Sequence, residues 1–296
     1  MAALLRTYLL PLLALCAVPA LTSLPGTCYR EITGPRPSHV LTKPPHEHLD
    51  PSSLPDNFDW RSVNGTLFVS EATNQFLPSP CGSCWAHAST GALTDRFIIA
   101  RKARVSQTKL SPQVLLDCAS DAGSCYGGND VLAYKFIHEH GITDVTCSPY
   151  QGVDNYYWGE IPCDQMMCRA CDLASTCKFV NGTKYYVSEY GSVQGEDEMM
   201  AEIYARGPIA CSIYAHSPAF LDYKSGIIQD PTAYNYTTHV VAITGWGVDQ
   251  DTGMKFWVGR NSFGTAWGEE GWFQLHRGVN CLDIEEHPCA WAVPKL

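Results

Sequence analysis

Hydrophobic side chains in the first half of the chain recur with the spacing of an α-helix. The first such segment, CWAHASTGALTDRFIIARKA, begins at Cys84, and Ser83 directly before it is a favourable N-cap. Ser111 followed by Pro112 predicts a second helix start, because proline is tolerated at the first helical position. The segment VLAYKFIHEH has the same spacing and ends at Gly141, a typical helix stop. The first half is therefore predicted to be largely helical.

The second half is predicted to consist mainly of strands. After one more helical segment, EDEMMAEIYAR, the chain contains the apolar runs IACSIYA, HVVAITGWGV, MKFWVGRNSF and GWFQLHRG. Glycine-rich turns separate these runs. Helices followed by strands predict an α+β fold with a helical lobe, roughly residues 54–165, and a β-rich lobe, roughly residues 166–285. We expect an active-site cleft between the two lobes.

The N-terminal region has a different character from the rest of the chain. Residues 1–23 combine a basic position with an apolar run and small residues, which is typical of a cleaved signal peptide. Residues 24–53 are rich in proline and histidine and show no hydrophobic period, which predicts a short pro-peptide or linker. The globular domain is expected to span residues 54–296. Sequons at Asn64, Asn181 and Asn235 favour glycosylation in the secretory pathway.

Composition narrows the class of protein. The 296 residues are 45% hydrophobic and 17% charged, which is typical of a globular protein. A net charge of −10 without a basic stripe argues against a nucleic-acid partner. Past residue 25 we expect no membrane span, because no stretch is long and apolar enough.

Fourteen cysteines in an oxidising compartment predict disulfides. Cys16 would leave with the signal peptide, and the odd remainder requires at least one thiol that is free or that changes partner. Cys81 and Cys84 have the C-x-x-C spacing of redox pairs, and Cys168 and Cys171 repeat it, which would suit a metal site. A structural disulfide is the simplest alternative. We expect no metal and no cofactor, since thiols in such a chain are oxidised.

A fourth interpretation makes Cys84 a nucleophile. Its predicted place in the first turn of a helix exposes the thiol to the positive end of the helix dipole, which favours the reactive thiolate. His239 opens the apolar strand HVVAITGWG, where a histidine has no evident packing role. Asn261 lies where the following strand ends, so that antiparallel pairing would bring it beside His239. Such an asparagine would orient the imidazole without adding charge.

Three motifs in fixed order resemble the papain-type cysteine peptidases: PCGSCWAHAS, THVVAITGWG and RNSFGTAWGEEGWF. The resemblance implies a papain-like fold whose central helix starts at the nucleophile, with a β-barrel-like second lobe. It implies that Cys84 is the nucleophile, His239 the base and Asn261 its orienting partner. Gln75 and the Cys84 backbone N–H would form the oxyanion hole. The implied reaction is hydrolysis of a peptide bond through a thioester at Cys84.

Within that family the chain resembles the cathepsin X (cathepsin Z) group. Cys84 lies nine positions after Gln75, which is three more than usual, and the pro-segment is short. The group implies carboxypeptidase action, in which a histidine of the inserted loop holds the C-terminal carboxylate of the substrate. Phe76 occupies this loop instead and cannot hydrogen bond to a carboxylate, so the anchor is in doubt. Phe263 likewise replaces the family's usual tryptophan and predicts a modest loss of activity.

The resemblance also implies a set of cysteine partners. Cys28 would form a disulfide with Cys84 that locks the precursor. The other implied disulfides are Cys81–Cys125, Cys118–Cys163, Cys147–Cys168, Cys171–Cys177 and Cys211–Cys289. Cys281 would then remain unpaired, although Cys211–Cys281 is a competing pairing that the sequence does not decide.

Further expectations concern substrates and partners. By resemblance, Gly127 and Gly128 form the wall that pairs with the substrate backbone, and Phe76 and Trp267 also line the substrate site. Peptides or proteins are the expected substrates of a monomeric lysosomal or extracellular enzyme, with cystatin-type inhibitors as possible partners. The alternatives are an endopeptidase, a dipeptide-removing enzyme, or a secreted binding glycoprotein on the same scaffold.

Overall fold

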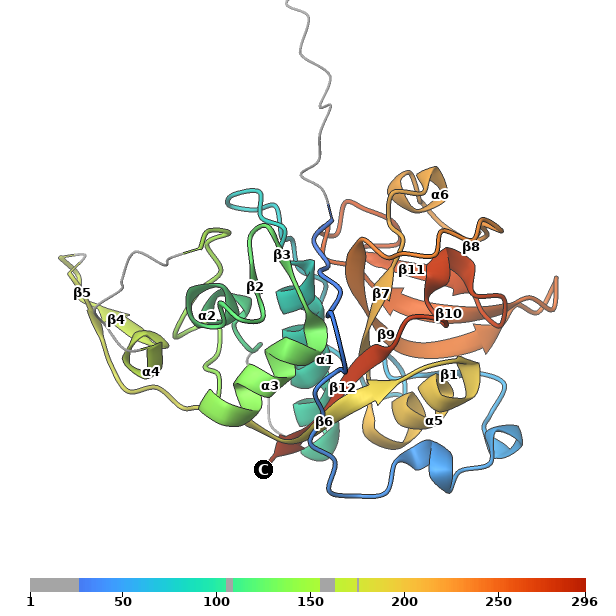
Figure 1. The fold of residues 1–296 in the computed structure, drawn as a ribbon, viewed down its shortest axis with the longest axis horizontal. Coiled ribbons are helices and arrows are strands. Elements are labelled where there is room, and N and C mark those ends of the chain that lie inside the picture. Colours follow the sequence, from blue (N-terminus) through green and yellow to red (C-terminus); the bar gives the residue numbers. More distant parts are fainter. Residues whose placement is uncertain (1–26, 105–108, 155–162, 175) are drawn as a thin grey trace, which may run out of the picture.

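The computed structural model describes residues 27–104, 109–154, 163–174 and 176–296. The expected signal peptide, with Cys16, lies outside these ranges. The predicted α+β fold is confirmed, with the helices on one side and a strand-rich lobe on the other (Figure 1). None of the helices in the described ranges combines the length and the apolar character that crossing a membrane requires.

The helical lobe is built around one central helix. Its helices are α1 (Cys84–Ala100), α2 (Pro112–Cys118), α3 (Asp130–His140) and α4 (Cys163–Met166). Ser111 and Asn129 cap α2 and α3 by accepting backbone N–H groups. Ser83 does occupy the N-cap position of α1, but its side chain makes no capping bond, because its hydroxyl pairs with the Tyr150 hydroxyl at 2.7 Å instead.

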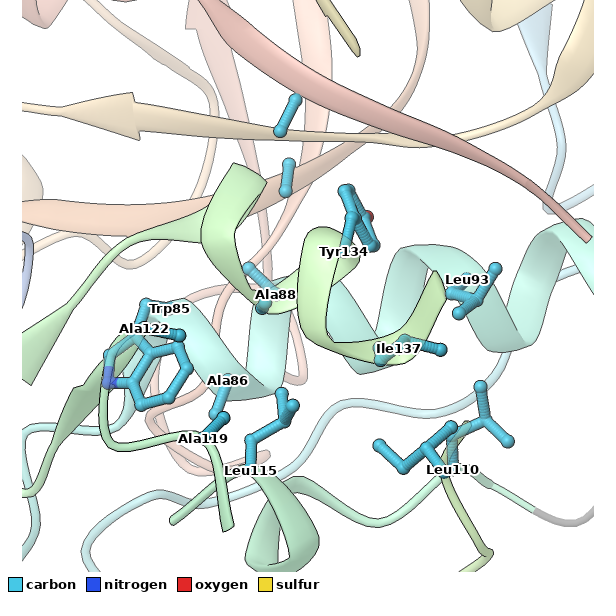
Figure 2. Packing of buried hydrophobic residues seen from close by; sticks show 14 of the residues in the cluster. Trp85, Ala86, Ala88, Leu93, Leu110, Leu115, Ala119, Ala122, Tyr134 and Ile137 are labelled. Carbon is cyan, nitrogen blue, oxygen red and sulfur yellow. The ribbon is translucent and has the colours of Figure 1, made fainter. Parts of the chain in front are cut away.

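The core of this lobe forms where the three longer helices meet. Trp85 and Leu93 of α1 are fully buried and belong to one hydrophobic cluster with Leu115 of α2 and with Tyr134 and Ile137 of α3 (Figure 2). Strands β9 (His239–Val248) and β12 (Cys289–Lys295) pack against α1 from the other lobe. Burial from several directions explains why α1 has few exposed positions.

The second lobe contains an eight-stranded sheet. Along its main path the order is β6-β12-β7-β9-β10-β11-β8, and β1 also pairs with β9. The neighbours are antiparallel except β11 and β8, which run parallel. The strands are β1 (Phe58–Asp59), β6 (Tyr186–Val193), β7 (Ile209–Ile213), β8 (Ile227–Ile228), β9 (His239–Val248), β10 (Lys255–Arg260), β11 (Trp272–His276) and β12 (Cys289–Lys295).

Aromatic side chains dominate the core of the strand lobe. Trp246, Trp257, Trp291, Phe220 and Phe273 are buried there in a second hydrophobic cluster. Two helices, α5 (Glu196–Arg206) and α6 (Pro218–Leu221), and the 3-10 turn η4 (Cys281–Asp283) complete the lobe. Large buried aromatic side chains supply much of the stabilising apolar area of a core.

Two buried arginine–carboxylate pairs join the lobes. Arg96 of α1 donates to Glu202 of α5 at 2.9 Å and to three backbone carbonyls of the strand lobe. Arg260 of β10 forms an ion pair with Asp95 of α1 at 2.8 Å. All four side chains are almost completely buried. Such pairs fix the position of α1, because losing one partner leaves an uncompensated buried charge.

The N-terminal segment from residue 27 to residue 53 runs between the two lobes and then along the strand lobe (Figure 1). It contains two 3-10 turns, η1 (Pro45–Glu47) and η2 (Pro51–Ser53). Arg36 forms an ion pair with buried Asp130 at 2.9 Å, and the Glu189 carboxylate accepts the backbone N–H groups of Leu41 and Thr42. The segment is therefore held by specific polar contacts as well as by its covalent link.

Six disulfides are present among the described residues. They join Cys28–Cys84, Cys81–Cys125, Cys118–Cys163, Cys147–Cys168, Cys171–Cys177 and Cys211–Cys289, the same partners that the family resemblance implies. The described free cysteine is Cys281, which is buried. Burial raises the pKa of its thiol to about 11. Cys281 is therefore protonated and unreactive at neutral and acidic pH.

The chain crosses between the lobes more than once. Residues 58–59 pair with β9 in the strand lobe. The short hairpin of β4 (Arg169–Cys171) and β5 (Cys177–Phe179) lies instead on the helical side, where Cys168 is bonded to Cys147 (Figure 1). The remaining short strands, β2 (Gly123–Ser124) and β3 (Gly127–Gly128), pair with each other in the helical lobe. Residues on both sides of position 165 thus contribute to each lobe.

Candidate active site

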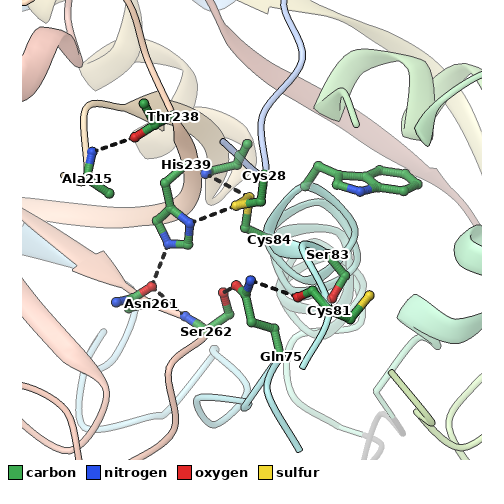
Figure 3. The surroundings of a disulfide bond; sticks show 12 residues. Cys28, Gln75, Cys81, Ser83, Cys84, Ala215, Thr238, His239, Asn261 and Ser262 are labelled. Atoms are coloured by element: carbon green, nitrogen blue, oxygen red, sulfur yellow. Dashed lines mark hydrogen bonds between the residues drawn. A yellow bond between two sulfur atoms is a disulfide. The ribbon is translucent and has the colours of Figure 1, made fainter. Parts of the chain in front are cut away.

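Cys84 lies where the N-terminus of α1 meets the strand lobe. The residue is fully buried and its sulfur is bonded to Cys28 of the N-terminal segment (Figure 3). The backbone N–H of Val240 in β9 donates to the Cys84 sulfur at 3.3 Å. Both the helix terminus and this N–H place positive charge at the sulfur, which would stabilise a thiolate once the disulfide opens.

His239 faces the sulfur pair with one nitrogen and Asn261 with the other. Its Nδ1 lies 3.1 Å from the Cys28 sulfur, and its Nε2 lies 2.8 Å from Oδ1 of Asn261 (Figure 3). The Ser262 backbone N–H donates to the same Oδ1 at 2.7 Å, which fixes the amide orientation. Because Oδ1 is an acceptor, Nε2 carries the proton and the Nδ1 lone pair points toward the sulfurs. The geometry places an imidazole acceptor beside the disulfide between Cys28 and Cys84.

Burial decides the charge state of His239 in this disulfide-bonded form. Desolvation lowers the pKa of its imidazole to about 4, and the nearby His216 lowers it further, while the hydrogen bond to Asn261 raises it. The imidazole is therefore neutral at neutral and mildly acidic pH. A thiolate at Cys84 would favour the imidazolium instead and raise this pKa.

Gln75 reaches the site from the loop that precedes α1. It is buried, its Nε2 donates to the Cys81 carbonyl at 3.1 Å, and its Oε1 accepts from the Ser262 hydroxyl at 2.7 Å. The second N–H of its amide has no described partner and remains available to a substrate. The Cys84 N–H lies in the first helical turn, where backbone donors have no partner within the helix. These two donors are the groups that an oxyanion hole requires.

Aromatic rings cover the histidine–asparagine pair. The Phe263 ring lies 4.9 Å from the His239 ring and 5.1 Å from the Phe76 ring. Trp267 packs beneath, against Phe220 at 4.9 Å, and is almost fully buried. Phe76 therefore lines the open part of the site, whereas Trp267 supports it from below.

A pocket of about 470 Å³ opens beside His239 and Gln75. Both lobes contribute to it: Gln75 and Phe76 come from the inserted loop, and His216, His239 and Phe263 come from the strand lobe. Thr27 and Cys28 also line the pocket, so the N-terminal segment partly covers it. The pocket is the part of the cleft that this segment leaves accessible.

Gly127 and Gly128 lie outside that pocket and pair with the N-terminal segment. The Gly128 N–H donates to the Cys28 carbonyl at 3.1 Å, and its own carbonyl accepts the Arg30 N–H at 2.8 Å. Gly127 has φ of 103°, and a Cβ there would lie 2.9 Å from the Thr27 carbonyl oxygen. A glycine is needed for both reasons. The segment thus occupies the backbone-pairing wall expected for substrates.

Two contacts at this site were not predicted from the sequence. Ser262 links Gln75 to Asn261, and the Val240 N–H supports the Cys84 sulfur. Ser262 adjoins Asn261 within the motif RNSFG, which is a signal that points to it. The Val240 contact depends on how β9 meets α1 and has no local signal.

A metal ion does not suit this arrangement of donors. Potential ligand atoms of Cys28, Cys84 and His239 lie within 4.8 Å of one another. The two sulfurs are bonded to each other, however, and a disulfide lacks the thiolate charge that binds metals. Cys81 has its own partner in Cys125, so the C-x-x-C spacing does not form a redox pair here.

The remaining predicted residues are the asparagines of the glycosylation sequons and the cysteines of the disulfides. Asn64, Asn181 and Asn235 are all exposed. The described cysteines other than Cys281 are all bonded. The structure thus brings together Cys84, His239, Asn261 and Gln75 (Figure 3).

The chain is similar to known cysteine proteases over most of its length. The model of the papain family cysteine protease matches residues 54–292. A cathepsin Z of Onchocerca volvulus is 41% identical over 277 residues, which cover 91% of this chain and 85% of that protein. Cathepsin B-like cysteine proteinase 4 of Caenorhabditis elegans is 31% identical over 268 residues, 84% of this chain and 78% of that protein.

Among solved structures, procathepsin B S9 from Trypanosoma congolense is similar, with a TM-score of 0.69 and 25% identity. The match covers 92% of this chain and 86% of that one. The geometry of the site and the family match over most of the chain agree. The chain belongs to the papain family of cysteine proteases.

Proposed function

We propose that the chain is the disulfide-locked precursor of a cysteine carboxypeptidase in which Cys84 is the nucleophile, His239 the general base and Asn261 its orienting partner. The observation that carries the proposal is the orientation of His239, whose Nε2–H is held by Asn261 and whose Nδ1 faces the sulfurs. Gln75 and the Cys84 N–H supply the oxyanion hole. A route through the secretory pathway to a lysosome or the exterior fits the disulfides.

Activation requires that the bond between Cys28 and Cys84 opens. A thiolate of a small-molecule or protein reductant attacks the Cys28 sulfur, and Cys84 leaves with the electron pair as a thiolate. Cys28 remains as a mixed disulfide with the reductant. The neighbouring imidazole of His239 then takes up a proton, which gives a thiolate–imidazolium pair.

The reaction then proceeds by acyl transfer. The Cys84 thiolate attacks the scissile carbonyl carbon, and the negative oxygen is held by Gln75 and the Cys84 N–H. His239 gives its proton to the leaving amine, and a thioester remains on Cys84. His239 next takes a proton from water, whose oxygen attacks the thioester and releases the acid and the thiol.

The inserted loop supports the preference for chain ends. Phe76 and its neighbours close one side of the pocket next to Cys84, away from the glycine wall that the N-terminal segment occupies. By resemblance that glycine wall holds the acyl part of the substrate, so the pocket would receive the leaving residue. A walled pocket leaves room for a short leaving group. Monomeric action and inhibition by cystatin-type proteins are further expectations.

Digestion of a defined peptide tests this proposal. The precursor is treated with a mild thiol reductant and freed of its pro-segment, then incubated at acidic pH with a peptide that has a free C-terminus. Mass spectrometry is expected to show products shortened one residue at a time from that end, and none with Cys84→Ala. Internal cuts would favour an endopeptidase. Absence of cleavage, with an unreactive Cys84, would favour a binding glycoprotein.

A further inference from the structure

The pocket beside Cys84 contains a second imidazole that the catalytic chemistry does not use. His216 lines this pocket together with His239, and these are the titratable side chains that could bring positive charge to it among the described residues. The rest of the lining is neutral and mainly apolar, as at Phe76 and Leu221. His216 also lies close enough to lower the pKa of His239 through its charge. A negatively charged group entering the pocket would therefore meet His216.

His216 is positioned firmly although its side chain is exposed. The preceding Ala215 N–H donates to the Thr238 hydroxyl at 2.9 Å, and the Tyr214 N–H donates to the Leu282 carbonyl at 2.9 Å. Ser217, directly after it, caps α6. The ring of His216 contacts that of Tyr214 at 5.8 Å between centroids. Its backbone is thus fixed on both sides, which limits the positions that the imidazole can reach.

The imidazole has no competing partner in the structure. Within the described residues, His216 makes no side-chain hydrogen bond and no ion pair. Asp230, which contacts the neighbouring Ser217, accepts hydrogen bonds from Ser217 and Tyr234. An exposed imidazole without a protein partner donates a hydrogen bond to a ligand in either protonation state, and it adds charge when protonated.

We infer that His216, which lines the same pocket as Phe76, binds the free C-terminal carboxylate of the leaving residue. The inference rests on the proposed function, since it names what the pocket recognises. A terminal carboxylate lies one residue past the scissile bond, about 3.8 Å along the chain from one Cα to the next. The anchoring group must therefore share a pocket with His239, as His216 does. The strand lobe thereby supplies the charge that the Phe76 loop lacks.

Matched peptides test this inference. The precursor, reduced and freed of its pro-segment as above, is assayed on an N-blocked peptide as its free acid, as its amide, and as an amide with aspartate at the last position. The ratio of kcat/KM for acid over amide is expected to fall about tenfold in His216→Ala, mainly through KM, because a charge-assisted hydrogen bond is lost. His140→Ala, which changes an exposed histidine of α3 far from the pocket, should keep the wild-type ratio.

The possible outcomes separate the two proposals. A wild-type ratio in His216→Ala, or equal turnover of acid and amide by the unmodified sequence, would overturn the role of His216 while leaving the peptidase intact. Recovery of turnover by the aspartate-containing amide would overturn recognition of the chain end, because it would show that any carboxylate suffices. If no peptide is cleaved and a thiol-directed epoxide does not label Cys84, the proposed function itself has failed.

Discussion

The helical lobe and the strand lobe hold their parts of the site by different means. Four disulfides lie within the described helical lobe, at Cys81, Cys118, Cys147, Cys171 and their partners, whereas the strand lobe has the one at Cys211. The strand lobe relies instead on a continuous ladder of backbone hydrogen bonds and a core of large aromatic residues. Outside α1 and α3, the helical lobe has only short helices and strands of two or three residues, which form few backbone hydrogen bonds. Disulfides contribute stability there instead.

The difference matters because each lobe supplies half of the chemistry. Cys84 and Gln75 belong to segments of the helical side. His239 opens β9, and Asn261 directly follows β10. The side chains from the two lobes must therefore stay within hydrogen-bonding distance of one another. We expect changes at the junction of the lobes to have larger effects than changes inside either lobe.

The largest effect is expected at the buried junction. Arg96→Ala removes the closer of the two arginines paired with Glu202, the other being Arg206 at 3.8 Å, and leaves several carbonyls without a donor. It should lower the free energy of unfolding by about 3–5 kcal/mol. Chemical denaturation measures the change. A matched replacement of both side chains, Arg96→Met with Glu202→Met, should be much less destabilising. Equal losses in the two variants would show that the charge pair does not hold the lobes together.

A somewhat smaller effect is expected for the oxyanion donor. Gln75→Ala should lower kcat by about 10²- to 10³-fold, because one donor to the developing negative charge is lost. Steady-state kinetics on a free-acid peptide measures it, and a thermal melt checks that the fold is kept. If KM rises while kcat is unchanged, Gln75 binds the substrate in its ground state and is not part of an oxyanion hole.

The disulfides of the two lobes are expected to differ in kind. Removing Cys81–Cys125 or Cys211–Cys289 by paired alanine substitutions should each cost about 2–4 kcal/mol of stability. Only the first should also reduce kcat at a temperature where both variants are folded, because the Cys81 carbonyl holds the Gln75 amide. An equal loss of kcat in both would mean that these links act only on global stability.

A still smaller effect is expected at Ser262. Ser262→Ala removes the hydroxyl that donates to Gln75 but keeps the backbone N–H that holds Asn261. The loss of one buried hydrogen bond corresponds to about 1 kcal/mol, or roughly fivefold in kcat/KM. Combining it with Gln75→Ala in a double-mutant cycle should give no further loss. Additive losses would place the action of Ser262 elsewhere.

The sequence predicts the individual elements of this fold and site better than it predicts the contacts between distant segments. Local signals are sufficient for α1, for β9 and for the order of Cys84, His239 and Asn261, because each lies in a distinct motif or amphipathic segment. The pairing of residues 58–59 with β9, the Arg96 contacts and the Val240 N–H at Cys84 all join segments distant in sequence. No local pattern encodes such contacts. Ser83 shows the same limit, since Tyr150, far along the chain, takes the hydroxyl that a cap would use.

The pH dependence of Cys84 alkylation tests the central claim most directly. In the disulfide-bonded form the pKa of His239 is lowered to about 4 and the imidazole is neutral. After mild reduction, thiolate and imidazolium should stabilise each other. Carboxymethylation of Cys84 by iodoacetate, followed by peptide mapping, should therefore stay fast well below the ordinary thiol pKa of about 8.5. In His239→Ala the rate should fall off below that value. An ordinary thiol titration in both proteins would contradict an activated Cys84.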